Sequence, residues 1–265
     1  MRGTNLYHCT KAQSLLKILD CKYFKPMFCL EQYTNVGVIK VKGAEREATV
    51  GNMAFAIVSF ADLLPSELKN HMDNFHADSF ISLSMEWAER NAISPVVYCN
   101  QGSIISSGVV NILTSSLISL DKNVGGNNPL SELVSHMRSA VSCLFPFIKQ
   151  YQGCYYDKLN HCFSSNERQF FLEREWRYIH LVLKGETYYL EENQFKDIKF
   201  RHGKENELVN HNYALKFNWD DIISFYIPPE YQNKELNNRI ANIFKVSELD
   251  IKHKLKKGAD DVHLV

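Results

Sequence analysis

Residues 170–183, FFLEREWRYIHLVL, constrain the fold most, because a charged segment changes there into a β-type run. From Glu175 onward, strand alternation places Glu175 and Arg177 on one face. The aromatic residues Trp176 and Tyr178 then fall on the opposite face. Two interpretations follow: an edge strand with a solvated Glu–Arg pair, or a carboxylate at the rim of a sheet, aimed into a cleft and held by neighbouring arginines. The sequence leaves both open.

Composition and charge exclude several classes of protein. The chain has 265 residues, enough for one large core, and its 30 Lys and Arg residues equal its 30 Asp and Glu residues. Bulk charge therefore does not indicate a nucleic-acid partner. The longest apolar runs are too short to span a bilayer, and the amino-terminal residues lack the apolar region of a signal peptide. We therefore expect no membrane segment and a cytoplasmic location.

Cysteine usage and the missing motifs narrow the chemistry further. Seven cysteines occur without a CxxC pair, and cytoplasmic proteins rarely form disulfides. Cys154 and Cys162 have no second pair of ligands at zinc spacing, so we predict no metal site. The chain also lacks the GxxxxGK[ST], GxGxxG, HExxH and GxSxG motifs. The usual signatures of P-loop, dinucleotide-binding, zinc-protease and hydrolase sites are therefore missing.

Short strands separated by short helices predict an α+β domain with a central mixed or antiparallel sheet, rather than a doubly wound fold. A hairpin is expected across Lys184-Gly185-Glu186, where residues 187–190 would pair with residues 178–183. The expected strands are residues 6–10, 53–60, 78–84, 95–99, 175–183, 187–190, 213–219 and 222–227. The expected helices are residues 11–19, 65–75, 85–91 and 235–244.

The middle of the chain has a different pattern from its two ends. Residues 130–151 show apolar positions at helical spacing, and residues 121–129, DKNVGGNNP, are the clearest loop. We therefore expect a single domain over residues 1–265 with a helical insertion at about residues 101–166. Residues 30–52 are polar and contain three glycines at intervals, which predicts a mobile hairpin or lid.

His8 stands at the end of the first expected strand, directly before the helix at residues 11–19. Thr10 is the expected N-cap of that helix. Because the N-terminus of a helix favours an anionic ligand, His8 is a candidate binding residue. A structural histidine is the alternative at such a place, and both interpretations stay open.

Four segments, taken together and in order, resemble the AbiGi-like abortive-infection proteins of bacterial phage defence. They are LYHCT with its following helix, VSFADLLPSEL…FISLSMEWAERNAISPVVY, EREWRYI and LKFNWDDIISFYIPPEY. The resemblance covers residues 6–99 and 167–231. AbiGi-like proteins have been regarded as the antitoxin half of a two-gene system, which implies a protein that binds and neutralises a partner toxin.

The LYHCT start also resembles the first strand of ADP-ribosyltransferases. This resemblance implies an ADP-ribosyltransferase-like fold with NAD as cofactor. It implies that His8 and Thr10 contact the nicotinamide ribose or amide. It also implies that Glu175, or less probably Glu173, is the catalytic carboxylate that stabilises an oxocarbenium-like sugar.

The same resemblance extends to the pyrophosphate and to the nicotinamide ring. Arg177, or alternatively Arg174, would hold the pyrophosphate bidentately. Tyr33 is the candidate stacking residue, with Tyr98 as the alternative. The chain departs from the expected YG-type pair before FISLS, where it has Phe75-His76.

Two functions follow from these resemblances. The first is an NAD-dependent ADP-ribosyltransferase that acts as a toxin in anti-phage abortive infection and modifies a nucleic acid or a protein. The alternative is a non-catalytic AbiGi-type antitoxin that neutralises a partner toxin. The environment of Glu175 separates them. A cleft shared with His8 favours the enzyme, whereas a carboxylate capped by a buried salt bridge, together with a filled cleft, favours the binding protein.

Overall fold

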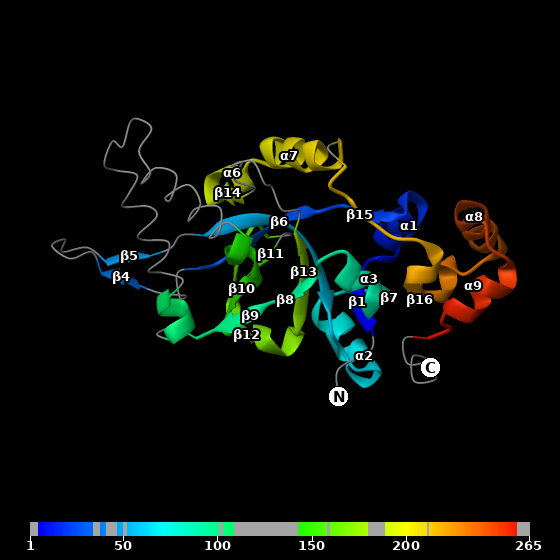
Figure 1. Ribbon diagram of the computed structural model, residues 1–265, viewed down its shortest axis with the longest axis horizontal. Coiled ribbons are helices and arrows are strands. Elements are labelled where there is room, and N and C mark those ends of the chain that lie inside the picture. Colours follow the sequence, from blue (N-terminus) through cyan, green and yellow to red (C-terminus); the bar gives the residue numbers. More distant parts are fainter. Residues whose placement is uncertain are drawn as a thin grey trace.

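The structure is a computed structural model whose described part has one large sheet, four small strand pairs and several helices (Figure 1). Among the helices of its described part, none is long and apolar enough to cross a membrane. The described residues are 5–33, 38–40, 47–49, 52–100, 103–108, 143–157, 160–179, 189–210 and 212–258.

The sheet has eight strands, and its centre is β6 (Met53–Ala61), whose apolar sequence predicts a buried strand. On one edge β6 pairs with β1 (Asn5–Thr10) and β3 (Met27–Glu31), and on the other with β13 (Glu175–Ile179) and β14 (Tyr189–Glu191). Outside these lie β7 (Ser79–Ser84) against β1, β16 (Ile222–Tyr226) against β7, and β8 (Ser94–Pro95) against β13. All of these pairs are antiparallel, which confirms the predicted α+β class.

Alternation along β6 gives the sheet two different faces. Ala54, Ala56, Val58 and Phe60 belong to the cores beneath the larger helical layer. This layer consists of α1 (Ala12–Cys21), α3 (Met85–Arg90), α6 (Glu192–Lys196), α7 (Ile198–Asn210), α8 (Lys234–Phe244) and α9 (Glu248–Lys254). In Figure 1, α6 and α7 lie over β6 and β14, while α8 and α9 lie at the far end beside β16.

The core under α1, α3, α8 and α9 is built around Trp87, which is completely buried. Its indole Nε1–H donates to the Lys216 carbonyl at 3.0 Å, so burial leaves no polar atom of this ring unpaired. The ring centres of Phe24 and Phe60 lie 6.1 and 5.5 Å from that of Trp87. Lys216 belongs to β15 (Leu215–Lys216), which pairs with β2 (Tyr23–Phe24) and so ties the carboxy-terminal half to the amino-terminal half.

The opposite face of β6 is covered at its two ends and open between them. At one end α2 (Pro65–Asn74) packs Leu68 and Met72 against Tyr7 and Ala61. At the other end Phe55 and Ile57 contact the segment formed by η1 (Phe145–Phe147), β10 (Ile148–Gln150) and β9 (Val97–Cys99). The side chain of Ser59 lies between these two clusters, so the fold leaves a space above the centre of the sheet.

The predicted helical insertion at residues 101–166 is wrong for its last part. This part contains β10, which pairs in parallel with β9, and β11 (Gln152–Asp157), which pairs with β12 (Cys162–Gln169). The apolar spacing of a short buried strand and of a helix turn cannot be told apart over so few residues. Residues 109–142, including the predicted loop, lie outside the described residues.

Most of the predicted hairpin between residues 178–183 and 187–190 lies outside the described residues. Its described end at β14 pairs with β6, directly beyond the end of β13 on the same edge. The physical reason is the length of β6: β13 covers its residues 57–61 and leaves residues 53–55 unpaired on that edge.

Within the predicted lid at residues 30–52, β4 (Val38–Lys40) and β5 (Glu47–Thr49) form an antiparallel pair. The mobility of this segment stays a prediction.

Thr10 is not the N-cap of α1 as predicted, and Asp78, which directly precedes β7, accepts a hydrogen bond from the first turn of the helix. Lys11 occupies the N-cap position without a side-chain hydrogen bond, and the Ala12 amide donates to Asp78 Oδ1 at 2.6 Å.

We expect Asp78→Ala to lower the free energy of unfolding by about 1 kcal/mol, because a helix amide loses its acceptor. The measurement is urea denaturation. Asp73→Ala, at an exposed ion pair, should change stability by less than about 0.5 kcal/mol.

Candidate functional site

Strand β13 carries a glutamate and an arginine that pair on the face with the open space. Arg177 Nε donates to Glu175 Oε1 at 2.7 Å, and a terminal nitrogen of Arg177 donates to Glu175 Oε2 at 2.9 Å. Arg177 also donates to the Pro146 carbonyl and to Glu31. Its side chain is 0% exposed. Arg177 is therefore a buried cation whose donors all point to groups of this chain.

A second cation approaches the same carboxylate from β10. Lys149 Nζ lies 2.8 Å from Glu173 Oε2 and 2.9 Å from Glu175 Oε2. It also lies 4.5 Å from the ring centre of Phe170. Five charged side chains therefore meet under this space: Glu31, Lys149, Glu173, Glu175 and Arg177. We call these five residues the ion cluster.

Burial and charge act in opposite directions on the carboxylates of the ion cluster. Burial acts to raise the pKa of Glu175, but Arg177 and Lys149 outweigh it and hold that pKa well below its usual range. The pKa of Glu173 is raised, first because the group is buried, although Lys149 acts against this rise. Glu175 is therefore the carboxylate that the fold stabilises in its charged form.

Ser59 of β6 connects the ion cluster to His8. Its hydroxyl donates to Glu175 Oε1 at 2.6 Å, and its carbonyl accepts from His8 Nδ1 at 2.8 Å. Burial lowers the pKa of His8, so the neutral ring donates through Nδ1 and leaves Nε2 as an acceptor. His8 and Glu175 are thus linked through one serine across three neighbouring strands.

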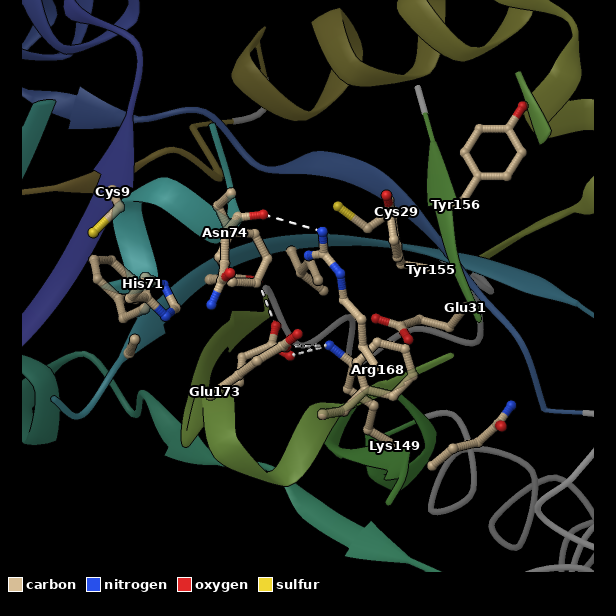
Figure 2. A pocket seen from close by; sticks show the side chains of 18 of the residues that line it. Cys9, Cys29, Glu31, His71, Asn74, Lys149, Tyr155, Tyr156, Arg168 and Glu173 are labelled. Atoms are coloured by element: carbon tan, nitrogen blue, oxygen red, sulfur yellow. Dashed lines mark hydrogen bonds and ion pairs between the residues drawn. The ribbon is translucent and has the colours of Figure 1, made fainter. Parts of the chain in front are cut away.

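A cavity of about 500 Å³ occupies the space above Ser59 (Figure 2). His8 and Glu175 both line it, and so do Glu31, Lys149 and Glu173 of the ion cluster. Its rim comes from the end of α2 and from the β11–β12 pair: His71, Asn74, Phe75, Tyr155, Tyr156 and Arg168. Burial lowers the pKa of His71 to about 4, so this ring is neutral near pH 7.

The predicted site residues divide between the cavity and the core. His8 and Glu175 reach the cavity, whereas Thr10, Tyr33 and Arg177 do not line it. Tyr33 is 1% exposed and donates its hydroxyl to the Phe145 carbonyl at 3.0 Å. This position buries the predicted stacking ring inside a hydrophobic cluster. The predicted pyrophosphate contact of Arg177 would require its buried donors to leave their present acceptors.

Tyr98, the alternative stacking residue, accepts a hydrogen bond from the Glu175 amide on its hydroxyl at 2.8 Å. Three other residues of the site have no local pattern that marks them. Ser59 and Lys149 contact Glu175, and Glu31 contacts Arg177, all from distant parts of the chain. In the part of the chain that the structure describes, no group of three His, Cys, Asp or Glu side chains is placed to hold a metal ion.

Comparison with known proteins identifies the family. The chain matches, over residues 22–228, the model of the family described as "Putative abortive phage resistance protein AbiGi, antitoxin". This chain belongs to the AbiGi family. No curated protein and no solved structure matches it.

This family membership corrects the first of the two predicted functions. The prediction of an ADP-ribosyltransferase toxin is wrong, because the family is described as an antitoxin. The alternative prediction, an AbiGi-type antitoxin, agrees with that description. NAD binding and the roles of His8, Thr10 and Tyr33 toward it stay predictions that nothing here tests.

Proposed function

We propose that this chain is the antitoxin of a two-gene abortive-infection pair and that it neutralises its toxin by binding it. In this proposal the sheet is a shell of the ADP-ribosyltransferase type without catalytic activity. The family description supports this function directly. The predicted helical insertion at about residues 101–166 is a further candidate for toxin contact, and its residues 109–142 lie outside the described residues.

The state of Glu175 is the structural observation that carries this proposal. Its Oε1 accepts from Arg177 Nε and Ser59 Oγ, and its Oε2 accepts from Lys149 and Arg177. A carboxylate that stabilises a developing positive charge needs an oxygen directed at the substrate. Both oxygens of Glu175 are directed at cations or a hydroxyl of this chain. His8 and Glu175 do share one open cavity, which is the arrangement expected of the enzyme. The capping of both Glu175 oxygens supports a structural role, and the family description supports the antitoxin.

Co-expression tests this function. The protein encoded next to this chain is induced alone and together with it in a bacterial host, and colony counts are compared. We expect growth to stop with the neighbouring protein alone and to recover with both proteins. The two proteins should also elute together in size-exclusion chromatography. Arrest by this chain alone, with relief by its neighbour, would assign the two roles the other way round and contradict the proposal.

A further inference from the structure

Arg168 of β12 lies across the rim of the cavity and is held by aromatic rings rather than by a carboxylate. Its guanidinium carbon lies 3.9 Å from the ring centre of Tyr155 and 5.5 Å from that of Phe75. One terminal nitrogen donates to the Asn74 carbonyl at 3.1 Å, the contact drawn in Figure 2. Stacking against two rings fixes the plane of the guanidinium before any ligand arrives.

This arginine differs from most of the other described arginines. Arg90, Arg174, Arg177 and Arg239 each form an ion pair with an aspartate or glutamate, and Arg201, which has no such pair in the described part of the chain, does not line the cavity. Over the described ranges, Arg168 has no such pair, although it is half-buried and lines the cavity. A guanidinium has five N–H donors, and one of those of Arg168 is used by Asn74. The remaining donors are available at the rim.

We propose that Arg168 is the anchor for a single carboxylate of the toxin, an inference that rests on the proposed antitoxin function. A guanidinium binds a carboxylate through two parallel hydrogen bonds, and this fork gives both strength and geometry. Because the rings already hold the guanidinium in place, little side-chain entropy is lost on binding. Arginine and tyrosine are also the residue types that dominate binding energy in protein interfaces.

The charge beneath the rim favours a protein carboxylate over a nucleic-acid phosphate. The ion cluster contains three carboxylates, Glu31, Glu173 and Glu175, and two cations, Lys149 and Arg177. It therefore carries one excess negative charge, which repels a polyanion more strongly than a single carboxylate. The whole chain has a formal net charge of zero, so it offers no general attraction to nucleic acid either.

Substitution of Arg168 tests the anchor. Calorimetric titration with the purified protein encoded next to this chain gives the dissociation constant for each variant. We expect Arg168→Gln to weaken binding about 30-fold or more, the effect of removing an interface hot spot. Arg168→Lys should be intermediate, because lysine keeps the charge but loses the fork.

Arg201 provides the matched control. It lies 4.5 Å from the ring centre of Phe195 and donates to the Phe195 carbonyl at 3.1 Å, a similar environment away from the cavity. Arg201→Gln should leave the dissociation constant unchanged. As a further arm, Arg168→Glu should regain affinity when one aspartate or glutamate of the toxin is changed to arginine.

The outcomes separate this inference from the proposed function. If the wild-type chain does not bind the neighbouring protein, both are overturned. If the wild type binds and Arg168→Gln binds equally well, only the anchor is overturned. Loss of binding to a single-stranded DNA oligonucleotide in Arg168→Gln, with toxin affinity unchanged, would assign Arg168 to a phosphate instead. Circular dichroism checks folding, and Arg168→Lys decides the question should Arg168→Gln not fold.

Discussion

Replacement of Arg177 by methionine should lower the free energy of unfolding by about 3–5 kcal/mol, the cost of removing one partner of a buried ion pair. The arginine side chain is 0% exposed, and it forms ion pairs with both Glu175 and Glu31. Methionine fills much of the same volume, so the loss reflects uncompensated charge rather than a cavity. The measurement is the midpoint and slope of urea denaturation.

Arg90→Met is the matched control for this prediction. Arg90 also pairs with a carboxylate, Asp221, at 2.7 Å; the arginine side chain is 61% exposed and that of Asp221 is 11% exposed. Water screens the exposed arginine, and Asp221 keeps the Asn218 amide as a donor to its other oxygen, so we expect a loss of about 1 kcal/mol. We therefore expect the control to unfold close to the wild type. Equal and small effects of Arg90→Met and Arg177→Met would show that the ion cluster does not hold the sheet together.

Local patterns predict some strands of this fold, because alternation and apolar runs are properties of neighbouring residues, but β3, β11 and β12 were not predicted. The pairing of Glu175 with Arg177 follows from their spacing on one strand, and the structure has it. β6 and β7 also lie where their apolar runs predict them. The partner of a strand is harder to predict from local patterns than the strand itself. β14 pairs with the end of β6 that β13 leaves free.

The ion cluster itself could be predicted only in part. Sequence places Glu173, Glu175 and Arg177 together, since they are neighbours in the chain. Lys149 was assigned to a helix, and Glu31 to the lid, so neither was expected beside Glu175. Their approach depends on β3 and β10 lying on either side of the same space, which is a property of the tertiary fold. Charge balance in a buried site therefore has no signature in a local window.

Glu175→Gln should destabilise the protein by about 2–3 kcal/mol near pH 7, whereas Glu173→Gln should change stability by less than about 1 kcal/mol. Glu175 accepts four hydrogen bonds, and Gln has only one carbonyl oxygen to accept them. Glu173 contacts Lys149, which keeps Glu175 as a partner after the substitution. Urea denaturation of both variants gives the two values.

The dependence on pH should have opposite signs for the two carboxylates. The folded-state pKa of Glu175 lies below its unfolded value, so its stabilisation is present above about pH 4.3 and is lost as the pH falls toward the folded value. The advantage of the wild type over Glu175→Gln should therefore begin to shrink near about pH 5 and should go on shrinking as the pH falls further. The folded-state pKa of Glu173 is raised, so the wild type should lose stability relative to Glu173→Gln as the pH rises above about 4.3.

Urea midpoints of the wild type and the two variants across this range test both signs together. A constant difference between the wild type and Glu175→Gln from about pH 7 to about pH 3 would mean that Glu175 titrates alike in the folded and unfolded states. That result would contradict its place as the charged centre of the ion cluster. As the pH falls, the urea midpoint of the wild type should approach that of Glu175→Gln, whereas the wild type should gain stability relative to Glu173→Gln. These opposite changes distinguish a carboxylate held by cations from one held mainly by burial.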